Sequence, residues 1–313
     1  MNGSINRRVA LIVLVSLSAI LLVECNKSED NPVNTPAVLL LAPTNLRAYS
    51  ASQSSVGLQW DLSASESNAA FLNYSIKVKD STGAAVLTQT VSKGNPQSVI
   101  TGLTEGVTYT FVIRSNGTGG IVSADSASVV WSPARRLTTD STNGPPIQVY
   151  EFASSSGASG LQFYSISSGA ARTQSLRASN PDRALADVYL ETNLDGSISL
   201  NNMAISPVPN PKNTFFSSVM RDANDLDDPQ LAPPASSTYT LNTVTIPSAV
   251  ATQAKILYAR SVIDNKYVRI LLQKNPATNL LYYSVSPNRY VRVQLSYQNR
   301  AGNVYAQVPP SLE

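Results

Sequence analysis

Histidine is absent from the 313 residues of this chain. Without an imidazole, the protein can hold no Ser-His-Asp triad, no histidine ligand to a metal and no imidazole base that works near neutral pH. Cysteine is almost as scarce, because Cys25 is the only one. A single thiol excludes a disulfide within the chain, so we expect packed secondary structure to supply the stability.

Charge is also sparse, at 14% of residues against 42% hydrophobic residues. The net charge is only +3, and the basic residues form no dense cluster and no nucleic-acid recognition motif. Nucleic acid is therefore not expected as a partner. The apolar content is enough for a core, and the length allows two domains of ordinary size.

The N-terminus has the pattern of a secretory signal peptide. Arg7 and Arg8 precede an apolar run from Val9 to Val23. A short basic region before an apolar core of this length is typical of such peptides, and the run is shorter than the roughly 20 residues that span a bilayer. We predict a signal peptide at residues 1–24, and no comparable run follows it.

Cys25 comes directly after the apolar run, and this arrangement resembles a bacterial lipobox. The resemblance implies that Cys25 is acylated after cleavage and anchors the protein in a lipid bilayer. Glu24 departs from the small residue that usually precedes the cysteine. An ordinary secreted protein with an incidental cysteine is the open alternative.

Residues 25–41 are polar and proline-containing, which predicts a flexible tether. Lys27, Glu29 and Asp30 resemble the surface-export signal of Bacteroidota lipoproteins. That resemblance implies a lipid-anchored protein on the outer membrane, facing the outside of the cell. A merely solvated linker is the alternative.

Residues 42–140 show period-two alternation of β-branched and aromatic residues, which marks half-buried strands. Short strands separated by turn residues at this spacing favour a sandwich of two antiparallel sheets. The expected strands are Ser55–Trp60, Asn73–Lys79, Val86–Val91 and a strand that contains Tyr109, Phe111 and Ile113 on one face.

Three motifs in this region resemble the fibronectin type III family. They are Pro43-x-x-Leu46-x-Ala48, the strand that ends in Trp60, and Gly102-Leu103-x-x-Gly106-x-x-Tyr109-x-Phe111. The resemblance implies an immunoglobulin-like β-sandwich in which Trp60, Leu103 and Tyr109 are structural. Trp60 would lie in the core, and the Tyr109 hydroxyl would bond back to the preceding loop. Such a domain is expected to act as a spacer or interaction module.

A linker at residues 141–146 leads to a second β-rich domain, residues 147–313, which holds most of the 14 tyrosines. The expected strands include Val149–Ala153, Leu161–Ile166, Asp187–Leu190, Ser197–Leu200, Lys255–Ile263, Lys266–Leu272 and Arg289–Tyr297. Asp264-Asn265 predicts a tight hairpin. Residues 201–247 are rich in proline and are expected to be irregular, and so either functional or disordered.

The second domain resembles the HmuY-like family of haem-binding surface lipoproteins. Its similar segments are Phe163–Gly169, Asp187–Leu190, the hairpin from Tyr258 to Ile270, and Leu295–Gln298. The resemblance implies haem as a possible cofactor. Because histidine is absent, Met203 and Met220 are the candidate thioether ligands, and Phe215 and Phe216 could line a flat apolar site. The alternative is that both methionines are core residues.

Two further groups of carboxylates could take part in metal binding or catalysis. Oxygen ligands in residues 222–228 could bind calcium, but Leu226 occupies one ligand position and a solvated acidic loop is favoured. Asp187 and Glu191 could form the carboxylate pair of a glycoside hydrolase. No catalytic motif or metal site stands out, so an enzyme is not expected.

The sequence therefore predicts an all-β, membrane-anchored bacterial lipoprotein that binds without catalysis. The first domain is expected to be a spacer. The second is expected to bind a small ligand, a glycan or another surface protein, without a cofactor. Haem capture and carbohydrate hydrolysis remain the two alternatives.

Overall fold

The computed structural model describes residues 39–228 and 235–304. The expected signal peptide, Cys25 and most of the tether lie outside these residues. Among the described residues, strands dominate and the only helices are short 3-10 turns, so the predicted all-β class is confirmed. None of these helices has the length and apolar character to cross a membrane.

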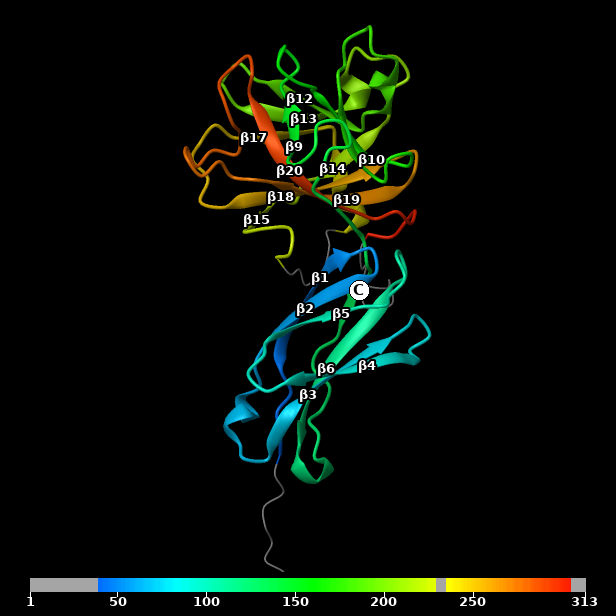
Figure 1. The fold of residues 1–313 in the computed structure, drawn as a ribbon, viewed down its shortest axis with the longest axis vertical. Helices are drawn as coiled ribbons and strands as arrows, with labels where there is room; N and C mark the ends of the chain where they lie inside the picture. Colours follow the sequence, from blue (N-terminus) through cyan, green and yellow to red (C-terminus); the bar gives the residue numbers. More distant parts are fainter. Residues whose placement is uncertain (1–38, 229–234, 305–313) are drawn as a thin grey trace, which may run out of the picture. The chain divides into compact units, whose positions relative to one another are not determined.

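The first sandwich consists of two antiparallel sheets (Figure 1). One sheet has the order β1-β2-β5, and its strands are Thr44–Ser52, Ser55–Asp61 and Gln97–Ile100. The other has the order β4-β3-β6-β7, and its strands are Ala85–Ser92, Phe71–Lys79, Tyr109–Gly117 and Val129–Trp131. The expected strands of residues 42–140 are all present, and β1 and β7 extend the two sheets.

Aromatic side chains fill the space between these sheets. Trp60 is 2% exposed and meets the edge of the Tyr74 ring, with the ring centroids 5.8 Å apart. Leu103 is buried, and the Tyr109 hydroxyl accepts a hydrogen bond from Thr104 N at 3.1 Å. These three residues therefore occupy the core and corner positions that the resemblance implied.

The second part of the chain is also built from two packed sheets. The smaller sheet has the order β11-β10-β12-β13-β17. Its strands are, in that order, Ala170–Gln174, Gly160–Ser165, Val188–Thr192, Ile198–Asn202 and Thr243–Ile246. The larger sheet has the order β16-β14-β18-β19-β20-β8, with β15 also paired to β18 and β9 to β20.

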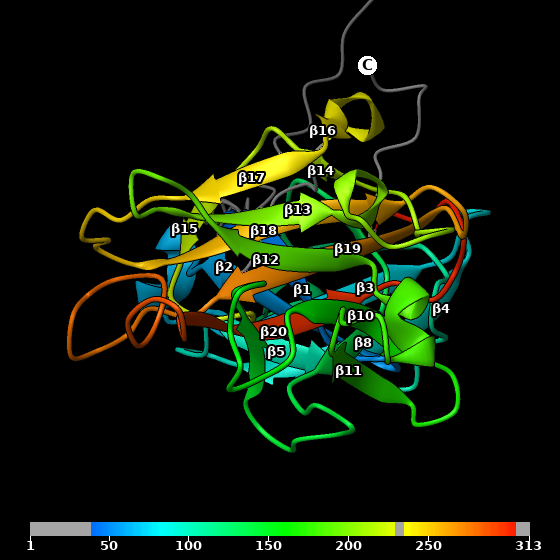
Figure 2. The same cartoon turned by 90° about the horizontal axis from the view of Figure 1, so that it is seen from above.

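The strands of the larger sheet, in the same order, are Tyr239–Leu241, Thr214–Ser217, Ala254–Ser261, Lys266–Leu272, Tyr290–Tyr297 and Arg135–Leu137, with β15 at Arg221–Ala223 and β9 at Ile147–Tyr150. Apolar side chains from both sheets form one core. Figures 1 and 2 show β12, β13 and β17 in one layer and β18, β19 and β20 in the other.

Strand β20 illustrates why this sandwich forms. Its side chains Val291, Val293 and Leu295 are fully buried, whereas Tyr290 and Arg292 on the opposite face are half exposed. The expected hairpin is also present, because Ser261 pairs with Lys266 and Asn265 takes a positive φ of 49° in the turn. Period-two alternation correctly predicted the buried face of β20, and the turn residues Asp264-Asn265 correctly predicted the hairpin.

The expectation of an irregular segment at residues 201–247 was wrong for its described part. Strands β14, β15, β16 and β17 lie in this segment, and residues 229–234 are outside the described residues. Each of these strands has three or four residues. Strands of three or four residues show too little alternation to be recognised from the sequence.

Strand β8 lies ahead of the predicted linker and pairs with β20. Arg135 within it makes a bidentate ion pair with Glu105, at 2.9 and 3.0 Å, and its guanidinium lies 5.0 Å from the Tyr164 ring centroid. Arg136 pairs with Asp227. Arg135 thus contacts residues of both the first sandwich and the second part of the chain.

Candidate ligand-binding site

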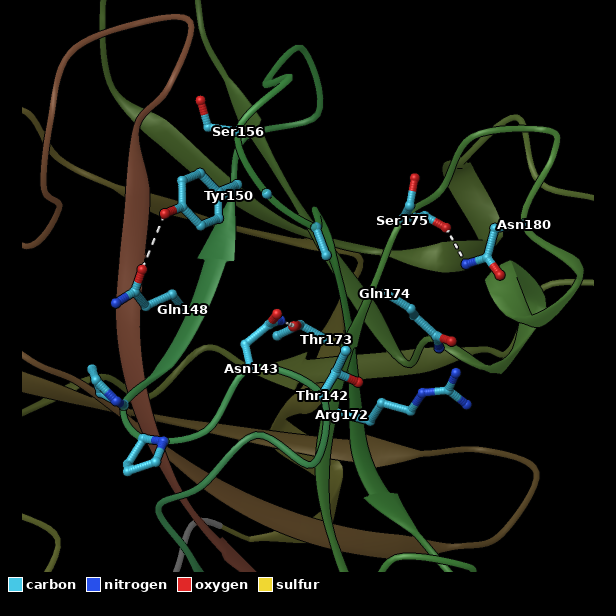
Figure 3. Close-up of a pocket in the computed structure, with 14 residues that line it drawn as sticks. Thr142, Asn143, Gln148, Tyr150, Ser156, Arg172, Thr173, Gln174, Ser175 and Asn180 are labelled. Carbon is cyan, nitrogen blue, oxygen red and sulfur yellow. Dashed lines mark hydrogen bonds between the residues drawn. The ribbon is translucent and has the colours of Figure 1, made fainter.

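A pocket of about 430 Å³ opens beside β9 and β11 (Figure 3). Gln148 and Tyr150 lie on one side of it, and Ser175 and Asn180 lie on the other. Its other lining residues are Thr142, Asn143, Pro145, Pro146, Ser156, Gly157, Ala158, Arg172, Thr173 and Gln174. Most of the 14 lining residues are polar and uncharged, and they come from the predicted linker, the strands β9 and β11 and two loops.

Asp140 holds the linker against β11. The carboxylate is buried and accepts hydrogen bonds from Thr142 N at 2.9 Å, Asn143 Nδ2 at 2.9 Å and Thr173 N at 3.1 Å, and it also bonds the Thr173 hydroxyl. Ser141 N adds a bond to Ala171 O at 2.8 Å. Four donors to one buried carboxylate fix the floor of the pocket, because a buried charge must be fully hydrogen bonded.

The loop after β9 folds back over the Tyr150 ring. Tyr150 N donates to Ala158 O at 2.9 Å, and Gly157 lies against the ring. The other neighbour of the ring is Tyr290, with centroids 4.9 Å apart. Burial, with a smaller contribution from Tyr290, raises the Tyr150 pKa although Arg292 opposes the shift. The hydroxyl therefore stays protonated and donates to Gln148 Oε1 at 3.1 Å.

The opposite wall is held by carboxamides. Asn180 Nδ2 donates to Ser175 O at 2.6 Å, and its Oδ1 accepts from Asp182 N at 3.1 Å. In the orientation that satisfies both of its ends, the Gln174 carboxamide donates to Asp182 O at 2.9 Å and accepts from Ala186 N at 2.7 Å. This wall is thus fixed in position before any ligand arrives.

Arg172 is the one charged side chain among the described residues that line the pocket. Its Nη2 lies 2.9 Å from Asp182 Oδ2, and the side chain is 33% exposed. The lining therefore offers hydroxyl and carboxamide groups, one aromatic ring and one guanidinium. Glycoside hydrolysis uses two carboxyl groups, and none of these described lining residues carries one.

The residues predicted to bind a flat ligand lie elsewhere and apart from one another. Met203 is fully buried in a small cluster with Leu176, Ala186, Tyr189 and Val208. Phe216 is buried in the core between the two sheets, and Phe215 packs against the other large core cluster. Met220 is 37% exposed. The Met203 thioether could reach a haem only if its cluster opened, so the two methionines do not fit a ready-made haem site.

The other carboxylates considered from the sequence have protein partners. Asp187 is buried, accepts from Phe163 N at 2.7 Å and lies 3.2 Å from Lys212 Nζ, whereas Glu191 is exposed and accepts from Asn201 at 3.2 Å. In the acidic segment, Asp222 pairs with Lys255 and Asp227 with Arg136. Among the described residues, no cluster suited to a metal ion is found.

The sequence offered no signal for this pocket. Pro145-Pro146 lies in the predicted linker and residues 154–157 lie between two expected strands, but nothing in their composition indicates that they line one pocket. Their proximity follows from the pairing of β9 with β20 and from the bonds of Asp140 to β11.

Comparisons with known proteins concern the first sandwich. A search of the curated proteins gave no match. Among solved structures, this chain is 16% identical to the FN5 domain of Drosophila Lar over 30% of this chain and 97% of that one, with a TM-score of 0.26. It is 21% identical to an FN3 domain of human collagen XX over 31% and 96% (TM-score 0.26), and 21% identical to an Fn3-like protein from Clostridium thermocellum over 30% and 92% (TM-score 0.25).

The family model described as fibronectin type III domain matches residues 41–130. The match contains the motifs that carried the resemblance, and it spans all the strands of the first sandwich except the final residue of β7. Residues 41–130 form a fibronectin type III domain.

Proposed function

We propose that the protein is a lipid-anchored surface protein that binds a saccharide without catalysis, in the pocket beside β9 and β11. The fibronectin type III domain acts as the spacer or interaction module that carries the second sandwich. Cys25 supplies the anchor in the lipid bilayer, and the outer surface of the cell is the location. The sequence predicted a small ligand, a glycan or another surface protein as the binding partner, and the proposal narrows this to a saccharide.

The observation that carries the proposal is the polar lining on a rigid support. Asp140, Asn180 and Gln174 hold the loops of the pocket through hydrogen bonds. A site that is held in place before binding loses little conformational entropy when a ligand enters. Polar groups fixed at an exact spacing are what a ligand covered with hydroxyl groups requires.

The size and character of the pocket favour this class over an apolar one. Its volume of about 430 Å³ lies within the usual range of ligand pockets, roughly 300–1,000 Å³. Typical sites for apolar ligands are lined mostly by hydrophobic and aromatic side chains. Here the single aromatic ring, Tyr150, donates a hydrogen bond to Gln148 through its hydroxyl and packs against Tyr290 and Gly157. Hydrogen bonding must therefore contribute most of the affinity.

The test uses the purified chain and a panel of neutral trisaccharides, namely maltotriose, cellotriose, xylotriose and mannotriose, with binding measured by calorimetry. Thr142→Trp places a large ring in the pocket, and Thr142 is exposed and bonds the fold only through its backbone N–H. We expect at least a tenfold loss of affinity for the trisaccharide that binds.

Thr139→Trp is the matched control, because Thr139 is an exposed threonine of the same segment that does not line the pocket. It should bind as the unaltered chain does. Binding that Thr142→Trp leaves unchanged would place the ligand elsewhere. Absence of binding to every trisaccharide would exclude neutral saccharides as the ligand.

A further inference from the structure

A second pocket, of about 320 Å³, lies on the other side of Arg172. Arg172 lines both pockets, so the two are joined by one side chain on β11. The other residues that line the second pocket are Gln162, Tyr164, Ser165, Ile166, Ser167, Leu185, Lys212, Asp264, Lys266 and Tyr297. Three of the lining side chains are cationic and one is a carboxylate, in contrast to the nearly uncharged first pocket.

Two of the three cationic side chains of this second pocket form ion pairs with carboxylates that do not line it. Lys212 Nζ lies 3.2 Å from the buried Asp187, and Arg172 pairs with Asp182, and neither carboxylate lines the pocket. Lys266 Nζ donates to the neutral Asn299 Oδ1 at 3.1 Å and lies 5.9 Å from the Tyr297 ring centroid. Among the described residues Lys266 has no carboxylate within ion-pair distance. Its ammonium is therefore the cation with which an anionic ligand would form an ion pair.

Hydrogen-bonding groups accompany Lys266. Asp264 is exposed, and no hydrogen bond or ion pair of its carboxylate is found within the described part of the chain. Tyr164 and Tyr297 stack at 5.2 Å, and neither hydroxyl bonds another described residue. Burial, reinforced by Asp187 and Asp264, raises the Tyr297 pKa, so its hydroxyl remains a donor. Ile166 and Leu185 add exposed apolar surface to the lining.

From this arrangement we infer that the second pocket binds the carboxylate of an acidic sugar that is linked to the sugar in the first pocket. The inference rests on the proposed function. Lys266 and Arg172 receive the carboxylate, Asp264 accepts hydroxyl groups of the same sugar, and the tyrosine hydroxyls donate. A simple anion would use the cations and leave Asp264 unpaired, whereas an acidic sugar satisfies both kinds of group.

The balance of charged side chains around the pocket favours a singly charged anionic group over a doubly charged one. Arg172, Lys212 and Lys266 are matched in number by Asp182, Asp187 and Asp264 around the pocket. A doubly charged phosphate would meet this surrounding negative charge at close range, and like charges that lose solvent repel each other. A single carboxylate, bound directly at the lysine and arginine heads, is the better fit.

The experiment compares two probes with the same sugar backbone: trigalacturonic acid, whose carboxylates are charged, and its fully methyl-esterified form, whose ester groups are neutral. Binding of each to the purified chain is measured by calorimetry at 20 and 300 mM NaCl. We expect the acid to bind at least tenfold more tightly than the ester at low salt, and this preference to shrink at high salt because the interaction is partly exposed to solvent.

Lys266→Gln should abolish the preference for the acid, so that the affinities of the acid and the ester become equal within a factor of about two. The matched control, Lys274→Gln, changes another lysine whose ammonium also bonds a neutral oxygen, Thr252 O, and which lies outside both pockets. This control should keep the preference.

The outcomes separate the inference from the proposed function. Binding of the ester that Thr142→Trp weakens, without any preference for the acid, overturns the second-pocket inference and leaves the proposed function in place. A preference for the acid that survives Lys266→Gln also overturns the inference. Failure of both probes, together with the neutral trisaccharides, contradicts both proposals.

Discussion

Gly157 touches the ring of Tyr150: a Cβ added to Gly157 would stand 2.1 Å from Tyr150 Cδ2. On another side the Tyr150 ring packs against the Tyr290 ring, with centroids 4.9 Å apart. Position 157 thus accepts no side chain while Tyr150 keeps its place, and Tyr150 is the aromatic side chain of the proposed saccharide pocket.

Gly157→Ala should therefore displace Tyr150 and weaken saccharide binding at least fivefold, since the ring and its hydroxyl lose their positions. Inserting a methyl group into a filled space costs about 1–3 kcal/mol of stability, which denaturant unfolding would detect. Ser155→Ala, an exposed change in the same loop, is the control and should behave as the unaltered chain. Unchanged affinity in Gly157→Ala would show that Tyr150 does not contribute to the site.

The two methionines should respond differently to truncation. Met203→Ala leaves a cavity in a fully buried cluster and should lower the free energy of unfolding by about 2–5 kcal/mol. Met220→Ala, at a partly exposed position, should stay within about 0.5 kcal/mol. The measurement is denaturant unfolding of both variants.

Haem titration of the unaltered chain and of both variants should give the same Soret spectrum, because neither sulfur is expected to bind the iron. A saturable shift, stronger under reducing conditions and lost in both variants, would contradict this and restore haem capture. Loss in Met203→Ala alone is ambiguous unless the variant is shown to be folded.

Asp187 should make stability depend on pH. Burial raises its pKa above the ordinary value of 3.8, and Lys212 opposes but does not reverse this shift. The folded state therefore binds more protons than the unfolded state in the window between the two pKa values. The free energy of unfolding should consequently fall as the pH rises through this window, and level off above the folded pKa.

Asp187→Asn keeps an acceptor for Phe163 N and removes the titration, so this component of the pH dependence should vanish. Thermal unfolding from pH 3 to pH 8 measures it, with the surface change Asp61→Asn as the control. A variant profile parallel to that of the unaltered protein would assign the dependence to other groups.

Cys25→Ser should move the protein from the membrane fraction to the soluble fraction, because the proposed acyl chains have no other attachment thiol. Ser28→Ala, in the same tether, should leave the distribution unchanged. Fractionation followed by immunoblotting measures both. A membrane-bound Cys25→Ser variant would assign the anchor to an uncleaved segment at residues 9–23 or to a non-lipid contact.

The sequence was informative wherever the signal was local. The alternation of Val291, Val293 and Leu295 with Tyr290 and Arg292 indicated which face of β20 is buried, because neighbouring side chains of a strand point to opposite sides whatever the strand pairs with. The motif from Gly102 to Phe111 carried the resemblance to the fibronectin type III family, which implied the corner position of Tyr109, and the matched family confirms the fold.

The sequence was misleading where strands were short. Phe216 lies in β14, a strand of four residues within a proline-rich stretch, and no periodicity can be detected over so few positions. The stretch therefore suggested an irregular ligand site, and its methionines and phenylalanines became candidates. Burial of Met203 and Phe216 depends on which sheets and loops close over them, which no local pattern records.

The sequence alone thus determined the all-β class, the first domain and the inward faces of the long strands, because these follow from periodicity and from motifs a few residues long. Only the tertiary structure decided the candidate site. Asp140, Tyr150, Gly157 and Arg172 come from separate segments. They meet because β9 pairs with β20 and because one buried carboxylate binds the linker to β11, and such non-local pairings depend on the packing of the whole sandwich.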